Sequence, residues 1–215
     1  MIELREADCR GVLPTLDRRA IALVLTDPPY GIPLRTSYGA QQRGRKARAR
    51  NYPPLIGAGV PFDPAPILAL DVPTILWGAN HYADRLPPAA GWLVWDKRIP
   101  LRNDAASCEL AWTNCVKVAR LFRHLWNGML RASEKQEHYH PTQKPVALMR
   151  WCLRLPGVPM TGLVLDPYAG AAPVGVVCAQ DSRDYLGLEL EPQYVAIGRQ
   201  RIAEAQAQLR LAERG

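Results

Sequence analysis

The amino-acid sequence predicts an α/β fold in which helices flank a mostly parallel sheet. Its 215 residues are 48% hydrophobic, which suits one domain with a sizeable buried core. Short apolar runs recur along the chain, and segments with helical spacing lie between several of them. Alternating strands and helices are typical of a parallel sheet that is covered by helices on its faces.

The predicted strands are apolar runs that end in polar or turn-forming residues. Several are rich in β-branched residues, as expected for strands covered on both faces. In chain order they are Ile2–Leu4, Ile21–Leu25, Val72–Trp77, Trp92–Trp95, Leu163–Leu165 and Tyr185–Leu188. The predicted helices are Val146–Leu155, Val174–Ala179 and Pro192 to about Leu211. Proline in a first turn favours a helix that begins at Pro192.

A long segment rich in Gly, Pro and Arg interrupts this alternation after residue 31. Loops of this length inside a compact domain are usually functional or disordered. We therefore expect a single domain over residues 1–215, with a basic mobile loop at about 33–60.

The net charge of +7 is concentrated in two segments. Residues 31–62 hold six cations and no acid, and residues 117–150 hold seven cations and two acids. A local excess of cations is typical of a surface that binds a polyanion, although a single basic run is more often only a solvated loop. The candidate phosphate contacts are Arg43, Arg45, Lys46, Arg48 and Arg50.

Several classes of protein are disfavoured by the sequence. No apolar run reaches the roughly 18 residues of a membrane span, and the first residues lack the pattern of a signal peptide. The five cysteines are scattered without a CxxC pair, so we expect neither a disulfide framework nor a metal site. These observations predict a cytoplasmic protein without a membrane partner.

The sharpest motif is Thr26-Asp27-Pro28-Pro29-Tyr30-Gly31, which directly follows a predicted strand. Open α/β sheets build their sites at the carboxyl ends of strands. Each proline disfavours the helical region for the residue before it, which leaves backbone carbonyls free to accept hydrogen bonds. Asp27 and a carbonyl could together hold both hydrogens of an exocyclic amine, while Tyr30 stacks on the attached base.

A second motif, Leu165 to Gly170, also places an acid at a strand end, before a turn of small residues and a helix. Gly170 permits a close approach of the backbone to a ligand. Glu189 follows the next strand, and an acid about 20 residues beyond such a turn often binds ribose hydroxyls. This spacing would also suit a nicotinamide-binding unit, but the glycines do not form GxGxxG, and no GK[ST] is present.

Together with His140–Pro145 (HPTQKP), Gly187–Tyr194 (GLELEPQY) and Glu6–Cys9 (EADC), these motifs resemble the amino-group DNA methyltransferases. Trp77–Asn80, Trp95–Lys97 and Cys108–Trp112 resemble the small phage-type members of that N6-adenine/N4-cytosine class. The motif order resembles its permuted arrangement, with the catalytic motif before the cofactor motif. The resemblance implies a Rossmann-like methyltransferase fold, S-adenosylmethionine as cofactor, DNA as partner and a homodimer as one assembly the family uses.

The resemblance also implies roles for individual residues. The catalytic motif comprises Asp27, Pro28, Pro29 and Tyr30. The cofactor-binding set comprises Asp8 near adenine, Thr142 or Lys144 near the carboxylate, Asp166 near the amine, Tyr168 and Gly170 in the methionine loop, and Glu189 on the ribose. Alternative roles are a helix cap for Asp8, a surface lysine for Lys144, and Glu191 in place of Glu189.

The implied activity is methyl transfer to N6 of a flipped adenine, because an acid rather than serine precedes Pro-Pro-Tyr. The alternatives are an N4-cytosine or an RNA methyltransferase. Ala171-Ala172-Pro173 replaces the family's usual Ser-Gly-Thr-like residues, so a nucleic-acid-binding remnant without cofactor is a further alternative. An NAD-dependent oxidoreductase would leave Asp27–Tyr30 without a role.

Overall fold

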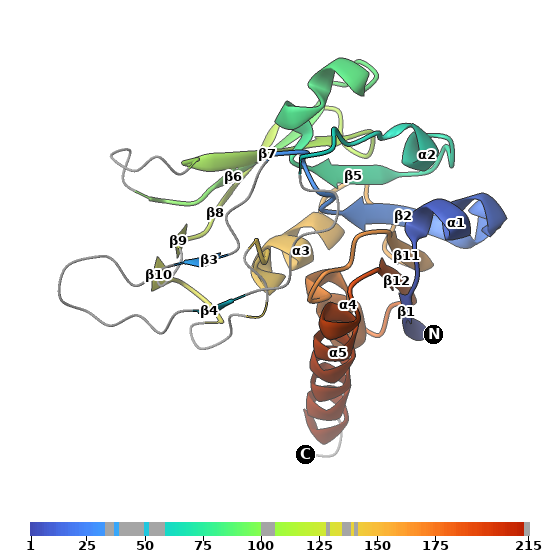
Figure 1. Cartoon of the computed structure of the whole chain (residues 1–215), viewed down its shortest axis with the longest axis vertical. Coiled ribbons are helices and arrows are strands. Elements are labelled where there is room, and N and C mark those ends of the chain that lie inside the picture. The colour runs from blue at the N-terminus through green and yellow to red at the C-terminus, as the bar shows by residue number, and fades with distance from the viewer. Residues whose placement is uncertain are drawn as a thin grey trace.

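A computed structural model of the chain describes residues 1–32, 37–38, 50–51, 59–99, 106–127, 130–134, 139 and 142–212. An eight-stranded sheet lies at its centre (Figure 1). In spatial order the strands are β1 (Ile2–Glu6), β12 (Tyr185–Glu189), β11 (Leu163–Asp166), β2 (Ile21–Thr26), β5 (Thr74–Trp77), β7 (Cys108–Thr113), β6 (Gly91–Asp96) and β8 (Arg120–Arg123). Neighbours pair in parallel, except that β7 is antiparallel to β5 and β6. The predicted mostly parallel sheet is confirmed.

Helices cover both faces of this sheet. On one face lie α3 (Val146–Leu153), α4 (Pro173–Gln180) and α5 (Pro192–Ala212), which extends well beyond the sheet in Figure 1. Their buried residues form one hydrophobic cluster with Leu23 and Leu25 of β2. The intervening Val24 belongs to a second cluster on the opposite face. This alternation follows from the two-residue period of a strand.

The opposite face carries shorter elements. These are α1 (Cys9–Val12), α2 (Ala65–Leu68) and the 3₁₀ turns Leu13–Thr15, Arg18–Ala20, Ala79–His81 and Ala83–Arg85. Two small hairpins complete the described elements, namely β3 (Ser37–Tyr38) with β4 (Arg50–Asn51) and β9 (Trp126–Asn127) with β10 (Leu130–Arg131). Most of the predicted basic loop, about 33–60, lies outside the described residues, so its mobility stays a prediction.

All six predicted strands and all three predicted helices are present, with shifted ends. The strand predicted from Val72 begins at Thr74, after Pro73, which has no N–H to donate to a ladder. The helix predicted to reach Leu155 ends at Leu153. Of the eight strands in the central sheet, β7 and β8 were not predicted. Strand β8 has exposed arginines at both ends and lies at the sheet edge, so it lacks the apolar run of a buried strand.

The topology brings the two sequence motifs together. Strands β2 and β11 are adjacent and parallel although the chain between them is long. The segments after Thr26 and Asp166 therefore meet at the carboxyl ends of the strands. Open α/β sheets bind ligands at these strand ends. Among the described helices, none is both long and apolar enough to cross a membrane.

Candidate active site

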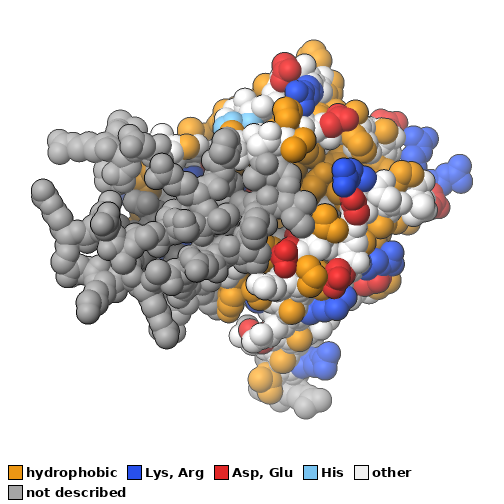
Figure 2. Space-filling view, viewed as in Figure 1, with side chains coloured by type: hydrophobic (Ala, Val, Ile, Leu, Met, Phe, Trp, Pro, Cys, Tyr) orange, Lys and Arg blue, Asp and Glu red, His pale blue; other side chains and the backbone are white. Residues whose placement is uncertain are grey.

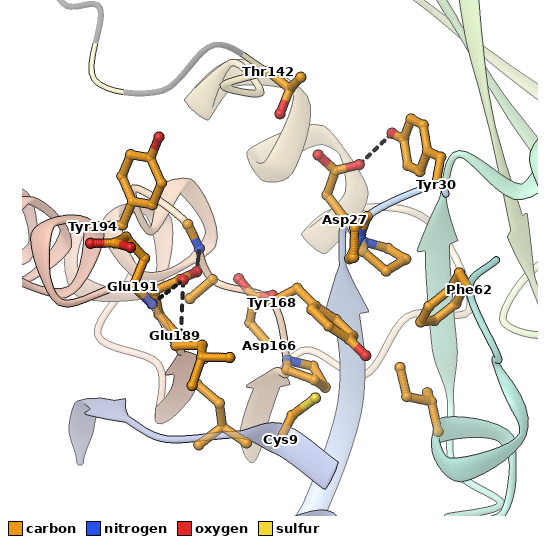
Figure 3. Close-up of a pocket in the computed structure, with 18 of the residues that line it drawn as sticks. Cys9, Asp27, Tyr30, Phe62, Thr142, Asp166, Tyr168, Glu189, Glu191 and Tyr194 are labelled. Atoms are coloured by element: carbon orange, nitrogen blue, oxygen red, sulfur yellow. Dashed lines mark hydrogen bonds between the residues drawn. The ribbon is translucent and has the colours of Figure 1, made fainter. Parts of the chain in front are cut away.

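A cavity of about 580 Å³ opens at the carboxyl ends of the central strands. Its size lies within the usual range for cofactor sites. Residues of both motifs line it, including Asp27, Tyr30, Asp166, Gly170 and Glu189 (Figure 3). The structure therefore joins the predicted catalytic and cofactor-binding residues in one space.

Asp27 and Tyr30 lie at one end of the cavity, where Pro28 and Pro29 carry the chain away from β2. The Tyr30 hydroxyl donates a hydrogen bond to the Asp27 carboxylate (Figure 3). One face of the Tyr30 ring stacks on His81, with centroids 5.0 Å apart and planes 15° apart. Burial raises the pKa of Tyr30 well above its usual value, so its hydroxyl remains a donor at neutral pH.

Lys144 contacts the same carboxylate. Its Nζ lies 2.7 Å from Asp27 Oδ2, 2.9 Å from the Tyr30 hydroxyl and 2.9 Å from Glu109 Oε2. Only 4% of its side chain is exposed, so Lys144 is not a surface lysine. Burial opposes its charge, but the two carboxylates outweigh burial and raise the pKa of Lys144. Lys144 is therefore a buried cation shared by two acids.

Two residues of this cluster were not expected to belong to the site. Glu109 on β7 and Lys97 after β6 form an ion pair of 2.5 Å, and both side chains are largely buried. Burial disfavours the Glu109 carboxylate, yet Lys144 and Lys97 lower its pKa to about 2. The signal in the sequence was an acid within the otherwise apolar Cys108–Trp112.

Gly78 determines where the Tyr30 ring lies. Its φ is +71°, and a Cβ added there would overlap the ring. We expect Gly78→Ala to lower the rate of the reaction at this site at least about tenfold, because displaced groups at a reacting centre cost that much or more. The matched control is Gly59→Ala, since Gly59 has a φ of +80° but no atom within 4 Å of the added Cβ. Equal rates in the two variants would contradict this role for Gly78.

Glu189 connects two backbone segments at the other end of the cavity. Its carboxylate accepts hydrogen bonds from the backbone amides of Gly170 (2.7 Å), Leu190 (2.9 Å) and Glu191 (2.8 Å) (Figure 3). The Gly170 turn and the end of β12 are thereby fixed to each other. The Glu191 carboxylate accepts the amide of Gln193 at 3.3 Å, in the first turn of α5. Glu189 is therefore the acid that contacts the glycine turn.

Asp166 of the second motif is buried beside Thr26 of the first, with 2% of its surface exposed. The Thr26 hydroxyl donates to it at 2.6 Å and accepts the amide of Tyr168 at 3.1 Å. Burial raises the pKa of Asp166 from 3.8 to about 7, against the opposing effect of the Thr26 hydrogen bond. The Tyr168 ring lies edge-on to Phe62, with centroids 5.7 Å apart.

Asp8 has the helix-cap geometry that was one of its two predicted roles. It accepts the Arg10 amide at 2.9 Å and pairs with the Arg10 side chain at 2.7 Å. Asp8 and Thr142 nevertheless both line the cavity, so the cap does not remove Asp8 from the site.

The altered turn after Gly170 has a regular structure. Ala172 takes a left-handed conformation with φ +52°, and Pro173 begins α4, where proline is well tolerated. Arg201 of α5 donates to the Ala171 carbonyl and pairs with Glu134 at 2.9 Å. The turn is thus supported from α5 without the hydroxyl groups of the family motif.

Arg43, Arg45, Lys46 and Arg48 lie outside the described residues, and of Arg50 only the backbone is described. On the described part of the face in Figure 2, Lys and Arg side chains are interspersed with acidic and apolar ones. The predicted phosphate contacts therefore stay a prediction.

Comparisons with known proteins show the family to which the chain belongs. The chain matches the DNA methylase family over residues 77–200, more than half of its length. It is 26% identical over 211 residues to the putative methylase YubD of Escherichia coli K12, covering 94% of this chain and 90% of that protein.

Solved structures share the fold. The cytosine-N4-specific PvuII DNA methyltransferase superposes with a TM-score of 0.61 at 15% identity, over 96% of this chain and 92% of that one. The M1.HpyAVI–SAM complex gives 0.56 at 17% identity, over 94% and 100%. The predicted methyltransferase fold is confirmed. The chain belongs to the DNA methylase family of N6-adenine and N4-cytosine methyltransferases, which use S-adenosylmethionine.

Proposed function

We propose that the protein transfers a methyl group from S-adenosylmethionine to N6 of an adenine flipped out of DNA. The observation that carries the proposal is the Asp27 carboxylate, which shares one cavity with Asp166 and Glu189. Adenine is favoured over cytosine because Asp, rather than Ser, precedes Pro-Pro-Tyr.

In this proposal the chain acts on the amine by hydrogen bonding. The lone pair of N6 is delocalised into the ring, which makes the amine a poor nucleophile. Hydrogen bonds from its two protons to Asp27 and the Pro28 carbonyl favour a more tetrahedral, nucleophilic nitrogen. The cofactor supplies an electrophilic sulfonium methyl group, and the nitrogen loses a proton after transfer. No covalent bond to the enzyme is required, so none of the cysteines is assigned a role.

Tyr30 is proposed to hold the target base. Flipping a base out of a duplex costs a few kcal/mol, and stacking on an aromatic ring returns about 1–3 kcal/mol. Because His81 stacks on one face of the ring, the base must stack on the other face or displace His81.

The cofactor is proposed to lie between the two cavity ends. Asp166 would hold the methionine amine, Gly170 and Tyr168 would contact its backbone, and Glu189 would bind the ribose hydroxyls. Asp8 would lie near the adenine ring and Thr142 near the carboxylate. A contact from Lys144 to that carboxylate stays a prediction, since its present partners are Asp27, Tyr30 and Glu109.

Nucleoside analysis of methylated products tests the proposal. DNA and RNA substrates are incubated with the purified protein and S-adenosylmethionine, then digested to nucleosides. We expect N6-methyladenine from DNA. N4-methylcytosine would overturn the adenine assignment, and a product from RNA alone would overturn the assignment of DNA as the substrate. Sequencing of modified bases in DNA from expressing cells would add the target sequence.

Cofactor binding separates an enzyme from a remnant. At a concentration 100 times the Kd, S-adenosylmethionine should stabilise the folded protein by about 2.7 kcal/mol. Thermal unfolding with and without the cofactor measures this stabilisation. An unchanged Tm would favour the remnant.

Arg43, Arg45, Lys46, Arg48 and Arg50 are proposed to bind DNA phosphates. Replacing all five by Gln should flatten the dependence of log K on log salt by up to about 0.9 for each phosphate that is no longer neutralised. DNA binding is measured at several salt concentrations, and calorimetry with S-adenosylmethionine serves as control. An unchanged salt slope would contradict this role.

Residues 1–215 are proposed to act as one cytoplasmic methyltransferase domain, and a homodimer stays a prediction.

A further inference from the structure

A buried charge cluster lies at the Asp27 end of the cavity, and the proposed chemistry uses only Asp27 among its members. It consists of two carboxylates, Asp27 and Glu109, and two ammonium groups, Lys144 and Lys97. Their side chains are 4–20% exposed. Four separate segments supply them, namely the ends of β2 and β6, the strand β7 and the segment before α3. Even for paired buried charges, desolvation can cost more than the pairing returns, so this arrangement calls for a specific role.

Lys144 is placed between the two acids rather than on either alone. Its Nζ is 2.7 Å from Asp27 Oδ2 and 2.9 Å from Glu109 Oε2. The second oxygen of Glu109 is occupied by Lys97 at 2.5 Å. One carboxylate oxygen of Glu109 is therefore paired with Lys97, and the other attracts Lys144.

The Tyr30 hydroxyl lies in the same network. It donates to Asp27, accepts from Lys144 at 2.9 Å and is 3.3 Å from Glu109 Oε2. In this geometry both oxygens of Asp27 have donors, so a target amine must compete for one of them. A cation bound by Asp27 alone would be harder to displace than one held in common by two carboxylates.

We infer that Glu109 is a positioning residue for methyl transfer, which shares Lys144 with Asp27 and so makes Lys144 easier for the target amine to displace from Asp27. The inference rests on the proposed function. Asp27 acts only when ionised, so the activity falls at low pH as Asp27 becomes protonated. We call this part of the pH profile the acid limb. Burial raises the pKa of Asp27, Lys144 opposes this, and the negative charge of Glu109 adds to it. Removing that charge should therefore move the acid limb to lower pH.

Other groups face Asp27 and must be kept constant. Besides Lys144, Tyr30 and Glu109, its electrostatic neighbours include Tyr82 and Asp166. Asp166 has a pKa of about 7 and titrates in the measured range. The variants below change neither residue, so a limb due to Asp166 would be the same in all the proteins.

The test compares Glu109→Gln with the double variant Lys97→Met and Glu109→Gln. The single change leaves Lys97 without its carboxylate, whereas the double change removes both partners of that pair and protects the fold. Glu3→Gln, which removes an acid paired with Arg5 on β1, is the control for a strand Glu. For each protein we measure kcat as a function of pH on adenine-containing DNA, the Kd of S-adenosylmethionine and the Tm.

In both Glu109 variants we expect kcat to fall about tenfold, which is within the range of rate losses when a polar group at a reacting centre is displaced. We also expect the acid limb to move to lower pH. Glu3→Gln should match the wild type. An unchanged kcat and acid limb in the double variant would overturn the inference, and so would a lower kcat with an unmoved limb, which indicates only a structural role. A wild-type protein that makes no N6-methyladenine would refute the proposed function itself.

Discussion

Replacing Asp27 by Ala is expected to lower the rate of methyl transfer by about two orders of magnitude or more, as for other positioned polar groups at a reacting atom. The variant removes the proposed acceptor of the target amine. It should still fold, because Lys144 keeps its contact with Glu109 at 2.9 Å and is not left as an unpaired buried cation.

Single-turnover methylation of DNA with saturating cofactor measures this effect directly. The matched control is Asp84→Ala, since the Asp84 side chain is 79% exposed and its nearest cation, Arg85, is 3.8 Å away. Cofactor affinity should survive in Asp27→Ala, because the contacts of Glu189 and Asp166 are unchanged. Near-normal turnover in this variant would remove Asp27 from the proposed mechanism.

The affinity for S-adenosylmethionine is expected to fall as the pH drops below 7. Asp166 has a pKa of about 7 in the protein without cofactor, mainly because it is buried. A cationic amine needs the ionised carboxylate, so a proton and the cofactor compete for the same site. If only the ionised form binds, the Kd weakens about tenfold per pH unit below 7, or about 100-fold at pH 5.

Asp166 also affects the stability of the folded protein, with a pH dependence opposite to that of cofactor affinity. The pKa of Asp166 is raised from its ordinary value of 3.8 to about 7 in the folded protein, so its protonation favours folding at low pH. This contribution to stability is lost as the pH rises from about 4 to about 7.

Calorimetry of cofactor binding between pH 5 and 8 tests the predicted loss of affinity, with Asp166→Asn as the comparison. That variant should bind weakly and with little pH dependence. A Kd of the wild type that is constant over this range would contradict the proposed role of Asp166.

The central strands could be predicted because β2, β11 and β12 are covered on both faces and therefore consist almost entirely of apolar residues. The three acids at their carboxyl ends, Asp27, Asp166 and Glu189, were found for the same reason. Strand β7 was missed because Glu109 interrupts its apolar run, and that interruption is the residue of functional interest.

The partners of Lys144 could not be found from spacing. Asp27 lies 117 positions away in the chain, and no local pattern records a contact over that distance. The resemblance indicated the cofactor carboxylate as its partner, because HPTQKP resembles part of a cofactor motif. Only the tertiary fold shows that the segment before α3 passes beside the end of β2.

The sheet order also constrains how the chain becomes active during synthesis. Strand β1 pairs with β12, from Ile2 opposite Tyr185 to Glu6 opposite Glu189, and β2 pairs with β11 near Leu163. These pairings are non-local, so they wait for the later part of the chain and form slowly. A nascent chain carries Asp27 from early on but at first has neither β11, which pairs with β2, nor Glu189, which contacts the glycine turn. We therefore expect a chain that ends before β12 to be inactive, because its Gly170 turn lacks the Glu189 carboxylate.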